Sequence, residues 1–178
     1  MNDFKTFIDR NDLEKINDFC RAGFYSDRAM LVMEAELTRT YRPKPYPVSL
    51  YEDTDLTKYL KANKKGFGEA MNPETLAKEL ENPNSRIYIL EYRKRIISSV
   101  TVWDEDEETV ETENIFTIPK YRGLGFARCI LMTALTEAKK RGKKKARLTV
   151  YSTDTAAIKM YRQLGFKVVK VLQEFKHE

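Results

Sequence analysis

The junction around Pro119 constrains the fold more than any other stretch of the chain. A β-rich run, residues 109–118, ends at this proline, and Gly123 and Gly125 follow it at the start of a long amphipathic segment. The pattern predicts a strand, a glycine turn and a helix over residues 121–141. A helix start leaves its first backbone amides unpaired and carries a partial positive charge. The junction is therefore either a site for an anionic ligand group or a turn that needs glycine only for its dihedral angles.

Hydrophobic periodicity places further strands and helices on both sides of this junction. Three β-rich runs separated by tight polar turns lead into it, which predicts consecutive antiparallel pairing. The expected strands are 48–52, 86–92, 95–104, 109–118, 147–151 and 166–175, and the expected helices are 56–67, 73–81, 121–141 and 155–164, the last two ended by Gly142 and Gly165. This order predicts an α/β fold in which helices flank a mixed, mostly antiparallel sheet.

The first forty residues form an appendage ahead of that fold. A helical pattern begins after Asp12 and stops at Gly23, and residues 28–38 fit either a strand or a helix. The segment YRPKPYP, residues 41–47, has three prolines and has to be extended. We therefore divide the chain into a front part, residues 1–42, and a main domain, residues 43–178.

Charge and composition limit the partners of the chain. A formal net charge of +5 favours an anionic ligand, but the lysine-rich run 139–147 lies at an expected helix end and no nucleic-acid motif accompanies it. No apolar run approaches the roughly 18 residues of a membrane span, and the polar N-terminus is unlike a signal peptide. Cys20 and Cys129 lack metal-ligand spacing. We expect a cytoplasmic protein without a membrane, nucleic-acid or metal partner.

Two motifs in the second half of the chain resemble those of the GNAT acetyltransferases. The stretch PKYRGLGFA matches the acetyl-CoA loop of the family, and DTAAIKMYRQLGF matches its later motif. The matching positions are Arg122, Gly125 and Ala127 in the first motif, and Ala157, Tyr161, Gly165 and Phe166 in the second. The second motif departs at Asp154, where the family usually has Asn, and at Met160. The resemblance covers residues 48–176 and implies the GNAT fold.

The resemblance implies acetyl-CoA as cosubstrate and no metal. In the family, the strand before the loop splays from its neighbour and binds the pantetheine arm through its backbone. Carried over to this chain, the pantetheine residues are Phe116, Thr117 and Ile118, and the pyrophosphate residues are Arg122, Gly123, Leu124, Gly125, Phe126 and Ala127. Asp154 and Ala157 are further cofactor-binding candidates, and the backbone amide near Ile118 is the implied donor to the oxyanion.

The resemblance also implies the catalytic groups. Tyr161 is placed as the acid that protonates the departing thiolate, and Glu111 or Glu113 as a base acting through water. The only histidine, His177, stands next to the chain end, and Cys129 has no histidine partner, so direct transfer to a primary amine is favoured over an acyl-enzyme. The acceptor is a small molecule or a peptide, and a homodimer is possible. The alternative is a non-catalytic module of the same fold that binds CoA or a protein.

The front part also resembles the end of the main domain. Placing the Gly23-Phe24 pair on Gly165-Phe166 brings DLEKINDFCRAGF over DTAAIKMYRQLGF. We therefore interpret the front as a remnant of a tandem GNAT repeat, with phenylalanine in place of the acid and no phosphate loop. Such a remnant cannot catalyse transfer, and we expect it to cover the edge of a sheet.

Overall fold

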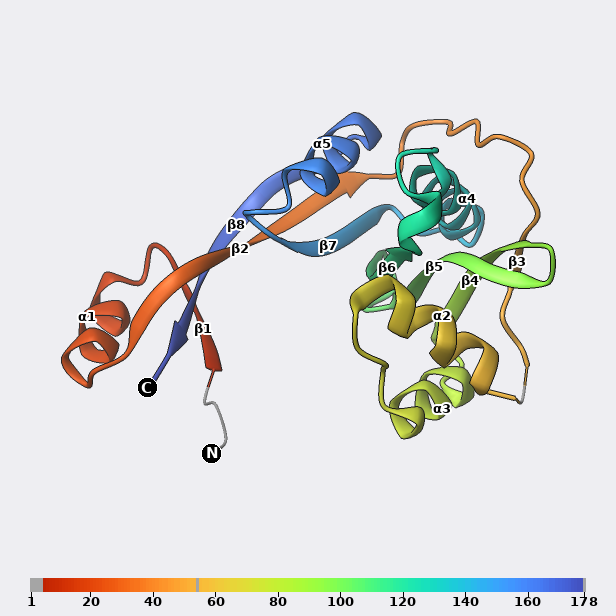
Figure 1. The fold of residues 1–178 in the computed structure, drawn as a ribbon. Coiled ribbons are helices and arrows are strands. Elements are labelled where there is room, and N and C mark those ends of the chain that lie inside the picture. The colour runs from red at the N-terminus through yellow and green to blue at the C-terminus, as the bar shows by residue number, and fades with distance from the viewer. Residues whose placement is uncertain (1–4, 54, 178) are drawn as a thin grey trace. The chain divides into compact units, whose positions relative to one another are not determined.

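The structure is a computed structural model that describes residues 5–53 and 55–177 (Figure 1). The chain divides into two compact units, and we describe each by itself. Unit 1 consists of Met1–Ala35 together with Arg147–Glu178, and unit 2 of Glu36–Ala146. The division at residues 42 and 43 that the linker suggested stays a prediction.

Unit 2 contains the strands and helices around the glycine junction. In chain order they are β3 Val48–Leu50, α2 Thr57–Phe67, α3 Pro73–Glu81, β4 Ser85–Tyr92, β5 Arg95–Asp104, β6 Thr109–Thr117 and α4 Phe126–Lys140. The strand order is β6-β5-β4-β3, and every neighbouring pair is antiparallel. The expected consecutive pairing of the three β-rich runs is therefore confirmed.

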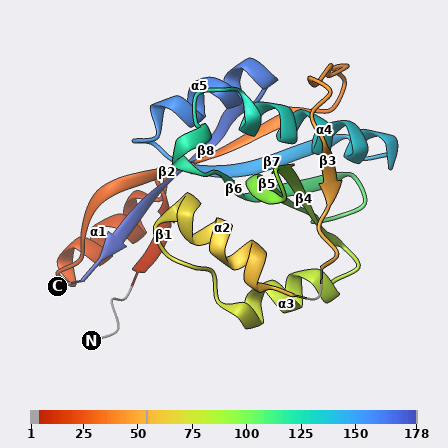
Figure 2. The same ribbon diagram turned by 45° about the vertical axis from the view of Figure 1, so that its right-hand side comes forward.

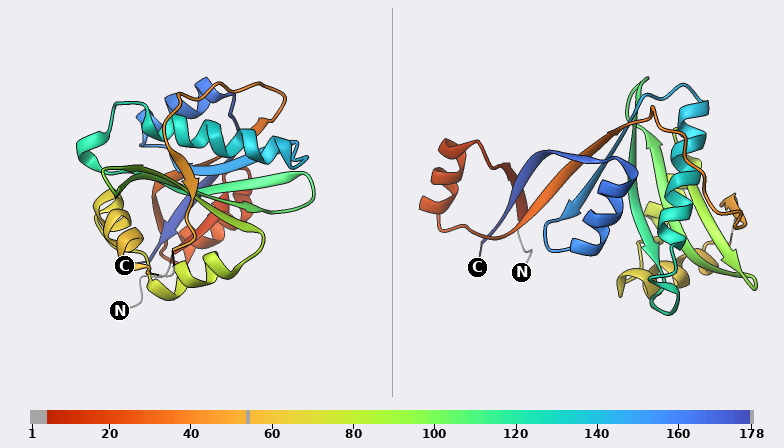
Figure 3. Two further views of the ribbon diagram at one scale, coloured as in Figure 1. Left: turned by 90° about the vertical axis from the view of Figure 1, so that its right-hand side faces the viewer. Right: turned by 90° about the horizontal axis from the view of Figure 1, so that it is seen from above.

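Helices cover both faces of the unit 2 sheet. Helix α4 lies on one face, and α2 and α3 lie on the other (Figures 2 and 3). The α4 side of the core includes Ile130, Leu131 and Leu135, while Tyr59 and Leu76 fill the opposite side, all fully buried. The amphipathic patterns of these helices therefore match the faces that they bury.

Helix α4 begins later than the sequence indicated. We expected its start near Tyr121, but Pro119–Tyr121 forms a short 3-10 turn and the α-helix starts at Phe126. Gly123 and Gly125 have φ angles of +77° and +83°, and such left-handed residues cannot continue a right-handed helix. The two glycines thus set the start of the helix.

The β4–β5 turn has an unusual composition. Tyr92 pairs with Arg95, so Arg93 and Lys94 alone form the turn, and their φ angles are +49° and +61°. A two-residue turn of this kind normally takes Asn-Gly, because a left-handed conformation costs other residues about 1–2 kcal/mol each. Two long cationic side chains therefore occupy strained positions at this end of the sheet.

Unit 1 contains the remaining elements in the strand order β1-β8-β2-β7. They are β1 Lys5–Asp9, α1 Leu13–Arg21, β2 Tyr25–Glu36, β7 Lys145–Tyr151, α5 Thr155–Leu164 and β8 Lys167–Lys176. The run 28–38, left open between strand and helix, belongs to strand β2 as far as Glu36, and its last two residues lie in the turn that follows. Strand β1 was not expected, and it pairs antiparallel with β8.

Two βαβ segments of unit 1 correspond at a spacing of 142 residues, the distance from Gly23 to Gly165. Asp12 and Asp154 each cap a helix, accepting from Lys15 N at 3.1 Å and Ala157 N at 3.0 Å. Strands β2 and β8 follow these helices and pair antiparallel. In their register Tyr25 is opposite Lys176 and Glu34 is opposite Lys167, which interchanges corresponding positions of the two segments. Unit 1 is thus internally two-fold symmetric in backbone, and its origin from a tandem domain stays a prediction.

A buried ion pair joins the two central strands of unit 1. Glu174 of β8 is fully buried, and its Oε1 accepts a hydrogen bond of 3.1 Å from Arg28 Nη2 of β2, while Arg28 Nε lies 2.8 Å from Oε2 as an ion-pair contact. The Arg28 guanidinium also lies over the ring of Tyr151, 4.5 Å from its centroid. This pairing satisfies a buried charge that would otherwise be costly.

Candidate active site

The turn before α4 presents free amides at the start of a helix. Gly125 is the N-cap residue, and no side chain caps the helix. A Cβ atom added at Gly123 or Gly125 would meet no atom within 4 Å, so open space adjoins the backbone of the turn. Uncapped amides and the helix dipole together suit an anionic ligand group.

Arg122 holds this turn in place through two side-chain hydrogen bonds to backbone carbonyls. Its Nε donates to the Thr117 carbonyl at 3.0 Å, and its Nη2 donates to the Gly66 carbonyl at 2.6 Å. The guanidinium therefore links the turn to the end of β6 and to the last part of α2. Its implied role as a phosphate ligand stays a prediction, while its positioning role is visible in these two bonds.

The end of β6 narrows the choice of backbone amide that could donate to the oxyanion. The Ile118 amide donates to the Ile97 carbonyl at 2.9 Å, so it is already paired with the strand beside it. Backbone N–H groups of successive residues in an antiparallel strand point to opposite edges. The amide of Thr117, not that of Ile118, therefore points away from β5 and remains the candidate oxyanion donor. The Phe116 side chain is buried against Tyr59 and Phe67.

A carboxylate that we did not expect lies on the α3 face of the sheet. Glu79 of α3 accepts from Asn114 Nδ2 at 3.4 Å and from Thr101 Oγ1 at 3.5 Å. Burial, reinforced by the negative charge of Glu113, raises the pKa of Glu79 to about 7. Desolvation also raises the pKa of Glu113. The negative charge of Glu113 therefore adds to burial in favouring the protonated form of Glu79.

Register places the expected base candidates on the same face as Glu79. Glu113 is opposite Thr101 and Glu111 is opposite Trp103 in the β5–β6 pair, and side chains two residues apart share a face. Asn114 follows with a φ of +49°, where the register of the pair shifts. This β-bulge turns the Asn114 side chain toward Glu79. The sequence indicated the glutamates of the strand but gave no sign of their helix partner.

A buried tyrosine lies on the same face, nearer the end of β6. Tyr59 of α2 is fully buried, and its hydroxyl lies 3.0 Å from Ser99 Oγ. Burial raises the pKa of Tyr59 to about 12, so the phenol stays protonated. It packs edge-on against Phe116, with ring centroids 5.9 Å apart. Tyr59 therefore positions the strand that carries the pantetheine candidates.

Unit 1 holds the remaining predicted residues. Tyr161 is buried in α5, and burial, followed by the charge of Asp154, raises its pKa to about 12. The Asp154 carboxylate caps α5 by accepting from the Ala157 amide. The aspartate that replaces the usual asparagine therefore has a structural role at the helix start.

Comparison with known proteins identifies the family. The sequence profile described as "Acetyltransferase (GNAT) family" matches residues 36–166. The chain belongs to the GNAT acetyltransferase family. The fold class is accordingly the GNAT α/β fold, a mixed sheet flanked by helices, as the two motifs implied. The matched region begins after strand β1, helix α1 and nearly all of β2, so the profile does not cover the front segment.

Individual GNAT relatives agree with this assignment. An uncharacterized N-acetyltransferase of Methanocaldococcus jannaschii is 35% identical over 69 residues, 39% of this chain and 30% of the relative. A GNAT from Sphaerobacter thermophilus has a TM-score of 0.80 at 16% identity, over 98% of this chain and 59% of its own. A GNAT of Elizabethkingia anophelis, solved with acetyl-CoA bound, has a TM-score of 0.57 at 18% identity, over 76% of this chain and 99% of its own. The chain thus spans less than two thirds of the length of the first two, 30% and 59%.

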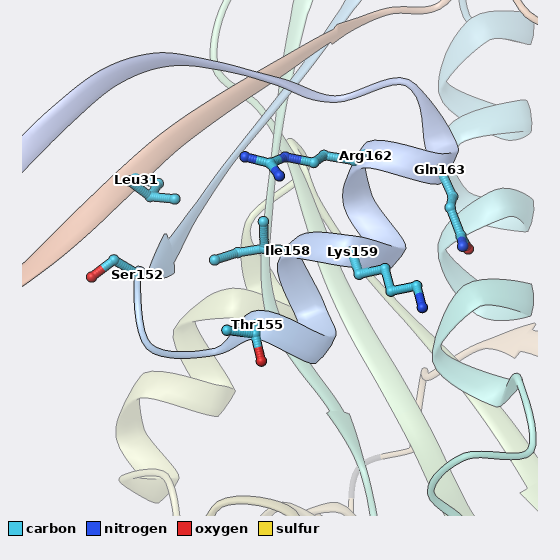
Figure 4. Close-up of a pocket in the computed structure, with 7 residues that line it drawn as sticks. All are labelled: Leu31, Ser152, Thr155, Ile158, Lys159, Arg162 and Gln163. Carbon is cyan, nitrogen blue, oxygen red and sulfur yellow. The ribbon is translucent and has the colours of Figure 1, made fainter.

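A pocket of unit 1 lies beside the predicted GNAT acid without including it. This pocket of about 720 Å³ runs along α5, where Leu31 and Arg162 extend toward one another over Ile158 (Figure 4). Ser152, Thr155, Lys159 and Gln163 complete its lining. Tyr161, Asp154 and Ala157 are absent from this lining, so the pocket is a surface feature of the other side of the helix.

The described part of the GNAT chain has neither a metal-ligand cluster nor a membrane-spanning helix. Within residues 5–53 and 55–177, no three His, Cys, Asp or Glu side chains gather as metal ligands. The helices of this described part are all too short or too polar to cross a bilayer.

Proposed function

We propose that the chain is an acetyl-CoA-dependent N-acetyltransferase that acetylates a primary amine, of a small molecule or a peptide, by direct attack. The observation that carries the proposal is Glu79, whose pKa of about 7 suits a general base at neutral pH. Its partner Glu113 belongs to the strand that leads to the candidate oxyanion donor. Family membership supports acyl transfer, and the raised pKa supports a route for the amine proton.

Glu79 is the proposed proton acceptor. The amine nitrogen must lose a proton as it forms a bond to the acetyl carbon, and a carboxylate with a pKa near the working pH removes it effectively. Glu113 lies on the same face and keeps the Glu79 pKa high through its charge. Glu113 or Glu111 can accept the proton through a water molecule, as the family resemblance implied.

The end of β6 and the α4 start are proposed to hold acetyl-CoA. Phe116, Thr117 and Ile118 would offer backbone groups to the pantetheine, and the Thr117 amide would donate to the oxyanion. The amides of residues 123–127 would bind the pyrophosphate, with Arg122 holding that turn in place. Acetyl-CoA supplies the activated acetyl group in a thioester, and the open space at Gly123 and Gly125 fits a ligand that approaches the backbone closely.

Tyr161 is proposed as the hydrogen-bond donor to the departing sulfur. As the carbon–sulfur bond breaks, its electron pair remains on sulfur, and a phenol with a pKa of about 12 is protonated at every physiological pH. A phenol of that pKa is a weaker acid than a thiol of about 8.5, so Tyr161 stabilises the thiolate mainly by hydrogen bonding. The proton that finally resides on sulfur then comes from solvent.

One experiment separates an enzyme from a CoA-binding or protein-binding module. The purified chain is titrated calorimetrically with acetyl-CoA and assayed for CoA release against amines and amino-terminal peptides. We expect micromolar binding and turnover, and Tyr161→Phe should lower kcat about tenfold or more while retaining cofactor binding. Tyr25→Phe, at an exposed unit 1 tyrosine, is the matched control. Binding without turnover on any amine would favour the CoA-binding module, and no binding would reject the enzyme and the CoA-binding module in favour of a protein-binding module.

A further inference from the structure

A second feature of unit 2, apart from the Glu79 face, is a pocket rimmed by cations. It has a volume of about 310 Å³, and its rim carries Lys58, Lys61 and Lys65 of α2 with Lys94 and Arg95 of the β4–β5 turn. The three α2 lysines are spaced three and four residues apart, which places them on one side of the helix. Two separate elements thus direct positive charge at the same space.

The floor of this pocket is apolar and buried. It is formed by Ala62, Ile96 and Ile118, and Ile118 is the residue at which β6 ends. A floor of low polarity weakens the screening of the charges above it. The rim therefore attracts an anion more strongly than lysines scattered on an open surface.

Most of the rim cations lack a carboxylate partner. Lys58 pairs with Glu91, but within the described residues no acidic side chain pairs with Lys61, Lys65, Lys94 or Arg95. Lys94 and its neighbour Arg93 occupy the strained turn positions, where Asn-Gly would be relaxed. Excess positive charge and retained strain at one pocket indicate a ligand of opposite charge.

The pocket adjoins the turn that is proposed to bind the cofactor. Arg122 of that turn donates to the carbonyl of Gly66, which directly follows Lys65 of the rim. Ile118 of the floor lies four positions before Arg122. A ligand whose diphosphate meets the α4 start therefore has this cationic rim next to it.

We propose that this pocket binds a phosphate group, and that the group is the 3′-phosphate of acetyl-CoA; this inference rests on the proposed function. The lysines and Arg95 donate charge-assisted hydrogen bonds to the phosphate oxygens. The apolar floor faces the neighbouring ribose and adenine.

The test compares acetyl-CoA with 3′-dephospho-acetyl-CoA by calorimetry in the full chain. We expect acetyl-CoA to bind about tenfold more tightly, and the double variant Lys61→Ala with Lys65→Ala to remove most of that preference. Lys64→Ala, on the same helix but outside the pocket, should keep it. A second variant, Arg93→Asn with Lys94→Gly, takes away turn charge while relieving strain, so its reduced preference cannot be attributed to misfolding.

Each other outcome has a distinct meaning. Equal loss of affinity for both ligands, or an unchanged preference in both pocket variants, would overturn the assignment of the pocket to the 3′-phosphate. If the two cofactors bind equally and inorganic phosphate binds in a pocket-dependent way, the phosphate belongs to the acceptor and the cofactor assignment is wrong. Absence of binding by either cofactor would reject the proposed function itself, and this inference with it.

Discussion

Asn114 Nδ2 donates a hydrogen bond of 3.4 Å to the carboxylate of Glu79, so a bulge residue of β6 holds a helix residue of α3 on the same sheet face. The bond joins two elements separated by more than thirty residues. It fixes a carboxyl group whose pKa is raised to about 7. The chemistry of the α3 face therefore depends on this contact as much as on the glutamates of β6.

Replacing this carboxylate tests its role as base. Glu79→Gln keeps the shape of the side chain and removes its proton affinity, so kcat with a responsive amine should fall by about a hundredfold or more. In the unmodified chain, kcat/KM should rise with pH through about 7, because Glu79 must be deprotonated to accept a proton. The variant should lack that rise. Glu81→Gln, near the end of the same helix, is the control, and an unchanged rate in Glu79→Gln would assign the base elsewhere.

The same substitution should stabilise the chain at alkaline pH. The folded-state pKa of Glu79 is raised from 4.5 to about 7, so the folded state holds a proton that the unfolded state releases. The contribution of this group is fully present below about pH 4.5 and is lost as pH rises through about 7. Near pH 8, Glu79→Gln should raise the free energy of unfolding by about 1–2 kcal/mol, reduced by solvent screening of a half-buried group. Urea unfolding of both proteins near pH 8 and below about pH 4.5 measures this difference in the free energy of unfolding. An equal gain in stability at the lower pH would contradict the linkage.

The glycine that starts α4 should matter more for binding than for folding. Gly125→Ala places a Cβ on a residue with φ of +83°, which should cost about 1 kcal/mol of stability and displace the first amides of the helix. Acetyl-CoA affinity should fall about tenfold. Gly142→Ala is a matched control, because Gly142 has φ of +90° at the other end of α4. Calorimetric Kd values that change equally in both variants would show that the turn does not bind the cofactor.

The buried ion pair of unit 1 should be sensitive to the loss of either partner. Arg28→Met leaves the Glu174 carboxylate buried without its cation, so the urea midpoint should drop clearly. Combining it with Glu174→Leu should recover much of the loss, because no unpaired charge then remains. Lys170→Ala, which breaks the more exposed pair with Asp9 in the same unit, should have little effect. A double variant as unstable as the single one would show that packing, not the buried charge, sets the cost.

The sequence predicted local structure best where caps and glycines mark it. Helix α5 has the expected bounds, because Asp154 caps its start and Gly165, with φ of +101°, ends it. The start of α4 was wrong by five residues, since periodicity continued through the turn while the backbone did not. Strand β1 is only five residues long, and its signal is weak without the partner strand β8.

Only those residues of the candidate site that lie within a recognisable motif could be predicted from the sequence. The glycine turn and Tyr161 stand in motifs that resemble those of the family, whereas Glu79 is one of several glutamates in an ordinary amphipathic helix. Its raised pKa and its position depend on side chains of two strands. These are Thr101 of β5 and Glu113 and Asn114 of β6. Such a contact across elements has no periodic signature in the chain, so only the folded structure reveals it.

The two-fold register of β2 and β8 has a consequence for how unit 1 holds together. Two matching βαβ segments that pair about an axis have the geometry of an isologous dimer interface, in which each surface meets its own counterpart. Here both segments belong to one polypeptide, so forming the contact requires no encounter between molecules. Its strength does not vary with protein concentration, and dilution cannot separate the halves.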